Sequence, residues 1–387
     1  MRLLWVVPRF GDTTVGGAER LVRELAVRAT PVGWSSEIAT TCAIDHATWE
    51  NVLPPGEERS NGLLVRRFPV GPRDGARYEH LHRAILAGEA GYAEELEWLA
   101  NSVWAPALQR FLEVHVSRYD LALFAPYFFG TTVWGSQVAP DRSALVPCLH
   151  DEPYARLATV RSVLGAVRGC IFNSAGEERL ARRLADIREG GVVGMGFDPP
   201  AAEPAARFAE PRGLGRYVLY AGRIEAGKRV ETAVQYAVRH AAERRDAPRL
   251  VLIGSGTYRP PPSAGDVVLH AGLLDGESRR AAYAEAVALV NPSHLESFSI
   301  VLMEAWLEGT PALVAHESDV MREHAQHSGG ALAFDSFESY RDGLDRLLDD
   351  PELARKMGGA GRDYVLDTYA WPKVARRLQQ TVERLVS

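Results

Sequence analysis

Residues 288–315 read ALVNPSHLESFSIVLMEAWLEGTPALVA and predict a strand, a turn, a helix and a second strand in succession. The apolar runs Ala288 to Val290 and Ala312 to Ala315 have the length and composition of buried strands. Between them we expect a helix from about Phe298 to Glu308, because a glycine and a proline follow and end it. A helix that joins two such strands is typical of a parallel sheet, so this stretch indicates an α/β fold.

Short apolar runs alternate with helical or loop segments on both sides of this stretch. Such runs are typical of strands in a parallel sheet whose two faces are covered by helices. Tyr78 to His115 is an exception, because it is largely helical and carries mixed charge. The remaining expected strands are Leu3 to Val7, Glu37 to Cys42, Leu63 to Phe68, Leu121 to Phe124, Ala144 to Leu149, Gly169 to Phe172, Tyr217 to Tyr220, Leu250 to Ile253 and Val267 to His270.

A segment rich in proline and alanine, Asp198 to Gly215, interrupts the alternation and predicts an interdomain linker. The sequence therefore indicates two doubly wound, Rossmann-like domains, residues 1–197 and 216–370, and a final helix at 371–387. In this architecture ligands bind at the carboxyl ends of the strands, and the cleft between two facing domains is the expected place.

The composition excludes several classes of protein. The chain has 387 residues, of which 46% are hydrophobic and 24% charged, so it is not a disordered protein. Its 50 acidic residues exceed its 44 basic ones, which argues against a nucleic-acid partner. Three separated cysteines and the lack of a leader or spanning segment predict a cytoplasmic protein. Weak peripheral contact with the inner face of a membrane is left open.

The turn before the helix of residues 298–308 is the strongest candidate for a binding site. It presents free backbone N–H groups and the positive end of a helix dipole, which favour a phosphate. Ser297 and Glu304 are seven residues apart, so on one helix they would share a face. This helix is apolar all round and is expected to be buried, so the Glu304 carboxylate needs a partner. Either an internal arginine or backbone group supplies it, or a pair of ligand hydroxyls does.

A second candidate, Gly222 to Lys228, directly follows a strand. Only three of the 44 basic residues are lysines, so Lys228 stands out in a chain that otherwise uses arginine. Arg223 grips a phosphate bidentately and Lys228 is a compact point charge, so together they would balance a diphosphate without a metal. The alternative is a solvated turn in which Glu225 screens both cations.

Two further candidates lie in the first domain. Gly16 and Gly17 open its first helix and permit close approach of a ligand, although a plain tight turn is the alternative. This turn is not a dinucleotide fingerprint, so NAD binding is excluded. His150 follows a strand and would contact a substrate, although a structural role is the usual one for a lone histidine.

Several enzyme classes are excluded by motifs that the sequence lacks. There is no HExxH motif, and Gly254-Ser255-Gly256 does not have the frame of a nucleophile elbow. Residues Gly222 to Lys228 have the glycine and lysine spacing of a phosphate-binding loop, but Arg229 stands where serine or threonine is required. No DxD pair is present, so no metal is expected at the site.

Taken in order, these motifs resemble the retaining glycosyltransferases of family 4, which have the GT-B fold. The resemblance runs through nearly the whole chain and includes GGAE after the first strand and GRxxxxK and GSG in the second domain. Its most specific part is PSxxESFxxxxxEAxxxGTP, which starts at Pro292. One departure is Ser299, where many members have glycine; its side chain would change the phosphate loop slightly or cap the helix.

The resemblance implies a role for each of these residues. Glu296 would bind hydroxyls of the donor sugar, Glu304 the ribose hydroxyls, and Arg223 and Lys228 the leaving diphosphate. Gly16 and Gly17 would lie against the donor, and His150 near the anomeric carbon on the acceptor side. The last helix would cross back to the first, acceptor-binding domain. The amides around Ser297, Phe298, Ser299 and Ile300 would bind the diphosphate, and the backbone around Gly254, Ser255 and Gly256 the nucleotide base.

The function expected from this resemblance is transfer of a sugar from a nucleoside-diphosphate sugar to a hydroxyl acceptor, without a cofactor or metal. Cations fixed at the leaving group stabilise the transition state more than the ground state. The resemblance suggests front-face substitution, in which the leaving phosphate helps to deprotonate the acceptor. The alternatives are a phosphorylase or epimerase-like hydrolase of the same fold, and an inactive module that only binds a partner.

The sequence leaves the substrates open. The acceptor, whether a glycan, a lipid-linked compound or a small natural product, is unreadable, as are the base, the donor sugar and the oligomeric state. The aromatic residues Tyr127, Phe128 and Phe129, with Trp134, follow a first-domain strand and would either line the acceptor site or pack in the core.

Overall fold

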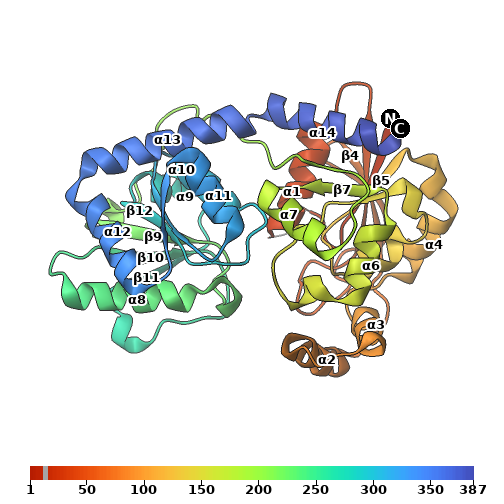
Figure 1. Cartoon of the computed structure of the whole chain (residues 1–387), viewed down its shortest axis with the longest axis horizontal. Helices are drawn as coiled ribbons and strands as arrows, with labels where there is room; N and C mark the ends of the chain where they lie inside the picture. The colour runs from red at the N-terminus through yellow and green to blue at the C-terminus, as the bar shows by residue number, and fades with distance from the viewer. Residues whose placement is uncertain (12–15) are drawn as a thin grey trace. The chain divides into compact units, whose positions relative to one another are not determined.

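The computed structural model describes residues 1–11 and 16–387, which form two compact units. The first unit comprises Met1–Gly196 and Trp371–Ser387, and the second comprises Phe197–Ala370 (Figure 1). Each has its own sheet of mostly parallel strands covered by helices, as the alternation of apolar runs predicts.

The sheet of the first unit has the strand order β3-β4-β2-β1-β5-β6-β7-β8. All neighbouring strands are parallel except β3 and β4, which form an antiparallel pair at one edge. The strand order reverses between β1 and β5, and such a switch point leaves a crevice at the carboxyl ends of the strands. The strands are β1 (Arg2–Val6), β2 (Ser35–Thr41), β3 (Gly56–Ser60), β4 (Leu63–Phe68), β5 (Leu121–Phe124), β6 (Ser143–Leu145), β7 (Gly169–Phe172) and β8 (Gly190–Val192).

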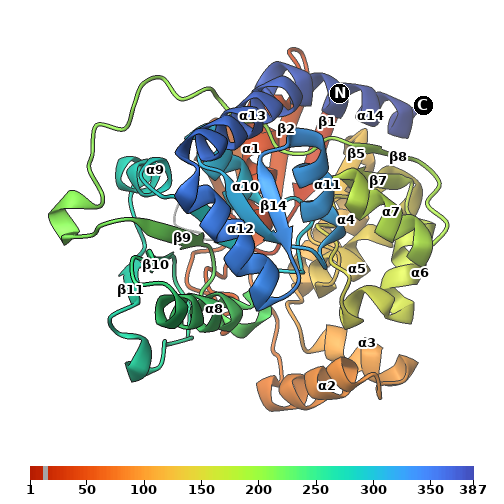
Figure 2. The same cartoon turned by 60° about the vertical axis from the view of Figure 1, so that its left-hand side comes forward.

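Helices of the first unit cover both faces of this sheet. Helices α2 and α3, from the segment expected to leave the sheet, lie side by side away from it in both views (Figures 1 and 2). The last helix, α14 (Trp371–Val386), packs against a π-helical turn, Leu25–Ala29, and against β8. The other helices are α1 (Gly17–Glu24), α2 (Gly75–Ala87), α3 (Tyr92–Ala100), α4 (Pro106–His115), α5 (Gly130–Ser136), α6 (Ala158–Ala166) and α7 (Ala175–Leu184).

The sheet of the second unit is entirely parallel, with the order β11-β10-β9-β12-β13-β14. Its strand order reverses between β9 and β12, so the expected ligand crevice lies where these two strands end. The strands are β9 (Tyr217–Ala221), β10 (Arg249–Ile253), β11 (Val268–Gly272), β12 (Ala288–Asn291), β13 (Ala312–Ala315) and β14 (Ala331–Phe334); the helices are α8 (Val230–Glu243), α9 (Gly276–Ala284), α10 (Ile300–Leu307), α11 (Asp319–Ser328), α12 (Phe337–Asp349) and α13 (Pro351–Tyr369).

Helix α10 is held in place by α13, which lies beside it (Figure 2). A Cβ atom at Gly358 of α13 would lie 1.7 Å from the carbonyl oxygen of Gly309, and one at Gly361 would lie 2.3 Å from the Trp306 ring. The glycines of α13 therefore allow the backbone of this helix to lie close to the end of α10. Trp306 is fully buried and its Nε1 donates to the Gly330 carbonyl oxygen at 3.0 Å.

Residues 198–215, expected to form a linker, are part of the second unit. The Phe208 side chain is fully buried and packs on Tyr217, with 5.6 Å between the ring centroids. The backbone amides of Phe208 and Ala209 donate to the two carboxylate oxygens of Glu285 at 3.1 and 2.8 Å. Prolines thus make this segment irregular, but buried contacts tie it to the sheet.

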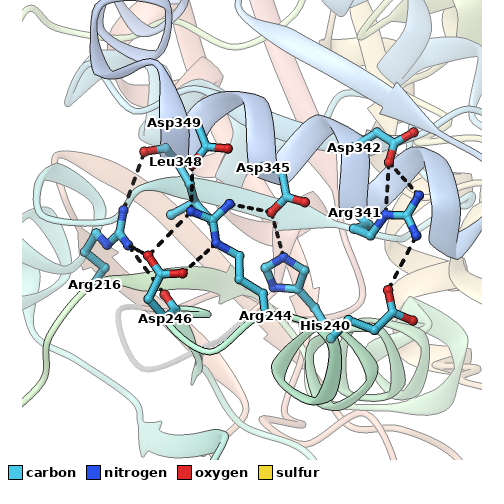
Figure 3. A network of polar contacts seen from close by, with 10 residues as sticks. Arg216, His240, Arg244, Asp246, Arg341, Asp342, Asp345, Leu348 and Asp349 are labelled. Carbon is cyan, nitrogen blue, oxygen red and sulfur yellow. Dashed lines mark hydrogen bonds and ion pairs between the residues drawn. The ribbon is translucent and has the colours of Figure 1, made fainter.

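A polar network holds α8 and α12 together at the amino edge of the second sheet (Figure 3). Arg244 donates to Asp345 at 2.7 Å and to Asp349 at 2.6 Å, and the His240 ring nitrogen lies 2.9 Å from Asp345. Three carboxylates hold the pKa of Arg244 above its ordinary value. This network stabilises the edge opposite to the one where ligands are expected.

No helix in the described part of the chain is long and apolar enough to cross a membrane.

Candidate functional site

The candidate site of the second unit is built from three turns at the carboxyl edge of its sheet. These turns follow β9, β10 and β12, and contain Gly222–Arg229, Gly254–Thr257 and Pro292–Ser299 respectively. Because β9 and β12 flank the switch point, the turns after them lie next to each other.

Glycines bring the turns after β9 and β10 into direct backbone contact. A Cβ atom at Gly254 would lie 1.8 Å from the Gly222 carbonyl oxygen, and one at Gly256 would lie 2.1 Å from that of Ile224. The Ile224 amide donates to the Ser255 carbonyl oxygen at 2.8 Å. Gly254 also has a φ of 133°, which side chains rarely tolerate. Only glycine at these positions allows the two turns to pack in this way.

Lys228 and Glu296 join the turns after β9 and β12. The Lys228 Nζ lies 2.8 Å from Glu296 Oε1 and donates to the Leu295 carbonyl oxygen at 2.8 Å. The two side chains are only 19% and 12% exposed, so this is a largely buried ion pair. The alternative of a turn in which Glu225 screens both cations is thus wrong for Lys228, whose partner is Glu296.

Arg223 lies on the same turn and is more exposed. Its guanidinium pairs with Glu225 at 3.0 Å, and its side chain is 49% exposed, so for this residue the screening by Glu225 is confirmed. The Tyr220 hydroxyl donates to the Arg223 carbonyl oxygen at 2.6 Å and fixes the backbone there. Burial raises the pKa of Tyr220, so it remains a neutral donor.

The turn after β12 starts α10 later than expected. The helix begins at Ile300, so Ser297 lies before it and does not share a helical face with Glu304. Ser299 has a left-handed backbone with a φ of 67°, a conformation that costs about 1 kcal/mol or more for a residue other than glycine. Its hydroxyl does not cap the helix and instead accepts from Asn291 Nδ2 at 3.1 Å. Phe298 is buried against Tyr369, with ring centroids 5.0 Å apart.

Glu304 has an internal arginine partner, which was one of the two expected possibilities. Arg279 Nη2 of α9 lies 2.9 Å from Glu304 Oε1, and the Tyr283 hydroxyl donates to Oε2 at 3.0 Å. The Glu304 side chain is 11% exposed, whereas that of Arg279 is 42% exposed. The carboxylate is therefore held in place from one side by α9.

In the first unit, Gly16 and Gly17 start α1 after residues 12–15, which lie outside the described residues. A Cβ atom at Gly16 would lie 2.0 Å from Glu19 Oε2, whereas one at Gly17 would meet nothing within 4 Å. Glu19 forms a buried ion pair with Arg9. A side chain at Gly16 would thus displace the Glu19 carboxylate from its place beside Arg9, while the space at Gly17 is open.

His150 lies after β6 and is half-buried. Its Nδ1 is 3.3 Å from Glu152 Oε1, which also accepts from the Tyr127 hydroxyl at 2.8 Å. Tyr127 is buried in the core, whereas Trp134 lines an open depression of about 750 Å³ with Trp104 on the helical layer. Tyr127 is thus a core residue, and the partly buried side chains of Phe128, Phe129 and Trp134 also pack against core residues.

Comparison with known proteins assigns a class to this pair of units. Residues 206–364 match the family described as glycosyl transferases group 1. The chain is 27% identical to D-inositol 3-phosphate glycosyltransferase of Thermobispora bispora, over 96% of this chain and 90% of the relative. Sucrose-phosphate synthase of Thermosynechococcus elongatus has the same fold, with a TM-score of 0.72, 19% identity and coverage of 99% and 98% of the two chains. The chain is a glycosyltransferase.

A second structural relative of this glycosyltransferase is Anabaena HepE in complex with UDP, with a TM-score of 0.71 and 13% identity over 99% and 100% of the two chains. These likenesses confirm the expected GT-B fold of two Rossmann-like units. The second unit holds most of the predicted site residues.

Sequence reasoning missed several residues of the glycosyltransferase that shape these sites. Arg279 and Tyr283 hold Glu304, and they lie on a helix whose pattern shows nothing unusual. Asn291 braces the turn after β12 and could have been noticed as a polar residue at the end of a buried strand. No group of histidine, cysteine and acidic residues in the described part of the chain has the arrangement of a metal site.

Proposed function

We propose that this glycosyltransferase moves a sugar from a nucleoside-diphosphate sugar to a hydroxyl acceptor, with the diphosphate at the carboxyl edge of the second unit. The observation that carries the proposal is the ion pair of Lys228 with Glu296, which places a cation and a carboxylate together at the switch point of the sheet. HepE, whose structures contain UDP or UDP-glucose, supports a nucleotide-sugar donor.

In this proposal binding of the donor separates Lys228 from Glu296, and each of the two residues then contacts the donor. The diphosphate is the stronger counter-ion for Lys228, because it carries more negative charge than one carboxylate. Its binding releases Glu296 to accept hydrogen bonds from the sugar hydroxyls. Arg223, on the exposed side of the same turn, is the second cation for the diphosphate.

The start of α10 and Glu304 place the rest of the donor. The first amides of a helix have no intrahelical acceptor, so those of Ile300 and the preceding turn are donors for a phosphate. Glu304, one turn further along α10, accepts hydrogen bonds from the ribose hydroxyls while Arg279 orients its carboxylate. The base lies against the glycine-rich turn of Gly254, Ser255 and Gly256.

The proposed reaction proceeds with retention and without a metal. As the anomeric bond breaks, negative charge grows on the diphosphate, so Lys228, Arg223 and the helix amides stabilise the transition state. The leaving phosphate takes the proton of the acceptor hydroxyl on the same face of the sugar. His150 contacts the sugar near the anomeric carbon, and Gly16 and Gly17 lie against the donor. We further propose a cytoplasmic protein with weak contact to the membrane surface at most.

The proposal is tested by nucleoside-diphosphate release from a panel of nucleotide sugars, with and without added hydroxyl acceptors. We expect release that depends on one donor and increases with an acceptor, and a product with the anomeric configuration of the donor. Release of sugar phosphate when inorganic phosphate is added would instead indicate a phosphorylase. No release from any donor, with no thermal stabilisation by nucleoside diphosphates, would indicate an inactive module.

A further inference from the structure

The first unit contains a fully buried carboxylate, Glu177, that the proposed reaction does not use. Glu177 lies in the first turn of α7 and is 1% exposed. Its amide donates to the hydroxyl of the N-cap residue Ser174 at 3.1 Å, which fixes the start of the helix. Burial raises the pKa of this carboxyl group to about 8, although hydrogen bonds from Asn173 and Leu149 oppose the shift, and no cation in the described part of the chain is among the groups that act on it. A buried ionisable side chain without a cationic partner is costly and calls for an explanation.

Both oxygens of Glu177 accept hydrogen bonds from backbone amides of two different turns. The Leu149 amide, after β6, donates to Oε1 at 2.6 Å. The Asn173 amide, after β7, donates to Oε2 at 2.5 Å. The side chain therefore links the turns that follow two neighbouring strands, β6 and β7.

The turn that Glu177 holds has an unusual backbone and carries His150. Cys148, next to Leu149, has a φ of 51°, in the left-handed region that costs other residues than glycine about 1 kcal/mol or more. Such a conformation persists only where the surroundings impose it. The short hydrogen bond from Leu149 to Glu177 and a contact of 3.7 Å from Asn173 Nδ2 to Cys148 Sγ supply this constraint.

We propose that Glu177 is a positioning residue for the transfer reaction, which acts by setting the turn of residues 148–150 and thereby the place of His150. The inference rests on the proposed function for the role of His150, but the link from Glu177 to the turn stands on geometry alone. Glu152 orients the imidazole ring at its Nδ1, and Glu177 fixes the backbone from which that ring projects.

The test compares Glu177→Gln with Glu178→Gln, a matched control on the same helical turn. Glu178 is partly exposed and pairs with Arg182 at 2.9 Å, so its substitution removes a charge from α7 without touching the turn. In Glu177→Gln, one of the two backbone amides faces an NH₂ group and loses its acceptor. Two readouts are measured, hydrogen exchange of the peptide covering residues 147–151, and the kcat and donor KM of transfer.

We expect this peptide to exchange at least about tenfold faster in Glu177→Gln than in the wild type. In Glu178→Gln it should exchange at the wild-type rate. We also expect kcat to fall about tenfold or more while the donor KM stays within about twofold. In a His150→Ala background, Glu177→Gln should change kcat by less than about twofold, because the residue acts through His150.

Unchanged exchange in Glu177→Gln would overturn the proposal, whether or not the wild type transfers sugar. An equal loss of kcat in the wild-type and His150→Ala backgrounds would also overturn it, since it would show a purely structural role. Faster exchange in a protein that transfers no sugar from any donor would keep the structural link and refute the proposed function instead.

Discussion

Lys228 Nζ and Glu296 Oε1 lie 2.8 Å apart and connect the turns that follow β9 and β12. The two residues are 68 positions apart in the sequence, and the switch point of the second sheet brings them together. A buried ion pair of this kind contributes little net stability, because desolvation offsets the attraction. The arrangement is better explained by the proposed function, in which a sugar diphosphate binds to both groups and separates them.

Lys228→Arg tests the shape of this cation rather than its charge. Arginine is longer and planar and cannot occupy the place where Nζ meets both Glu296 and the Leu295 carbonyl oxygen. We expect kcat for nucleoside-diphosphate release to fall about tenfold or more, given that loss of a transition-state donor costs about 10²–10³-fold. Lys356→Arg, on the exposed surface of α13, is the control and should retain full activity. Full activity of Lys228→Arg would show that any cation in this turn is sufficient.

Glu304→Ala tests the proposed contact of this carboxylate with the ribose. Loss of a hydrogen bond to a charged group costs about 1.5–3 kcal/mol, so the Kd for the nucleoside diphosphate should rise at least about tenfold. Calorimetric titration measures this directly. Glu277→Ala removes an exposed carboxylate that pairs with Arg280 on α9, and it should leave the Kd unchanged. Equal affinities of wild type and Glu304→Ala would mean that Glu304 serves only to hold Arg279 and Tyr283 and does not bind the ribose.

Gly254→Ala tests the backbone contact between the turns after β9 and β10. The added methyl group would lie 1.8 Å from the Gly222 carbonyl oxygen, at a φ of 133°, so the turns must separate. We expect the free energy of unfolding to fall by at least about 1 kcal/mol and nucleotide binding to weaken. Gly215→Ala, where a Cβ atom meets nothing within 4 Å, should be neutral in both measurements. A stable Gly254→Ala variant with normal affinity would show that this contact is dispensable.

Asp345→Asn tests the network at the opposite edge of the second unit. Burial acts to raise the pKa of Asp345, but hydrogen bonds from His240 and Arg244 outweigh it and hold the pKa below its ordinary value. A carboxylate with a lowered folded-state pKa contributes stability above its unfolded-state pKa, and this contribution is lost as the pH falls through the folded-state pKa. Asp345→Asn should therefore unfold at lower temperature than wild type near pH 7, and the difference should shrink in strong acid. A difference in melting temperature that does not change with pH would contradict this.

The positions of most buried strands along the chain could be predicted from the sequence because each is a short apolar run. The strands β3, β8 and β14 were missed, and each is the last strand at an edge of its sheet. Strand β3, Gly56–Ser60, is also charged and exposed. The linker prediction at 198–215 failed to anticipate Phe208, whose burial depends on contacts with distant residues. Local pattern therefore identifies central strands well and edge elements poorly.

The sequence indicates candidate residues for the site but not the contacts between them. The sequence pattern drew attention to Lys228 and Glu304, and the family resemblance to Glu296, yet no local pattern could show that Lys228 meets Glu296. Nor could it show which of the many arginines meets Glu304, because both pairings depend on how the strands are ordered. The offset of Ser297 from α10 was missed because the left-handed Ser299 delays the start of the helix. Such a conformation is readily inferred for glycine but not for serine.

Calorimetric titration of the wild type and of Lys228→Gln with UDP, GDP and dTDP tests the central claim most directly. The account predicts that at least one of these nucleotides binds the wild type at a single site, and that Lys228→Gln, still folded, binds it at least about tenfold more weakly. Binding that is equally tight in the two proteins, or no binding of any of the three to the wild type, would contradict a diphosphate site at the Lys228–Glu296 pair.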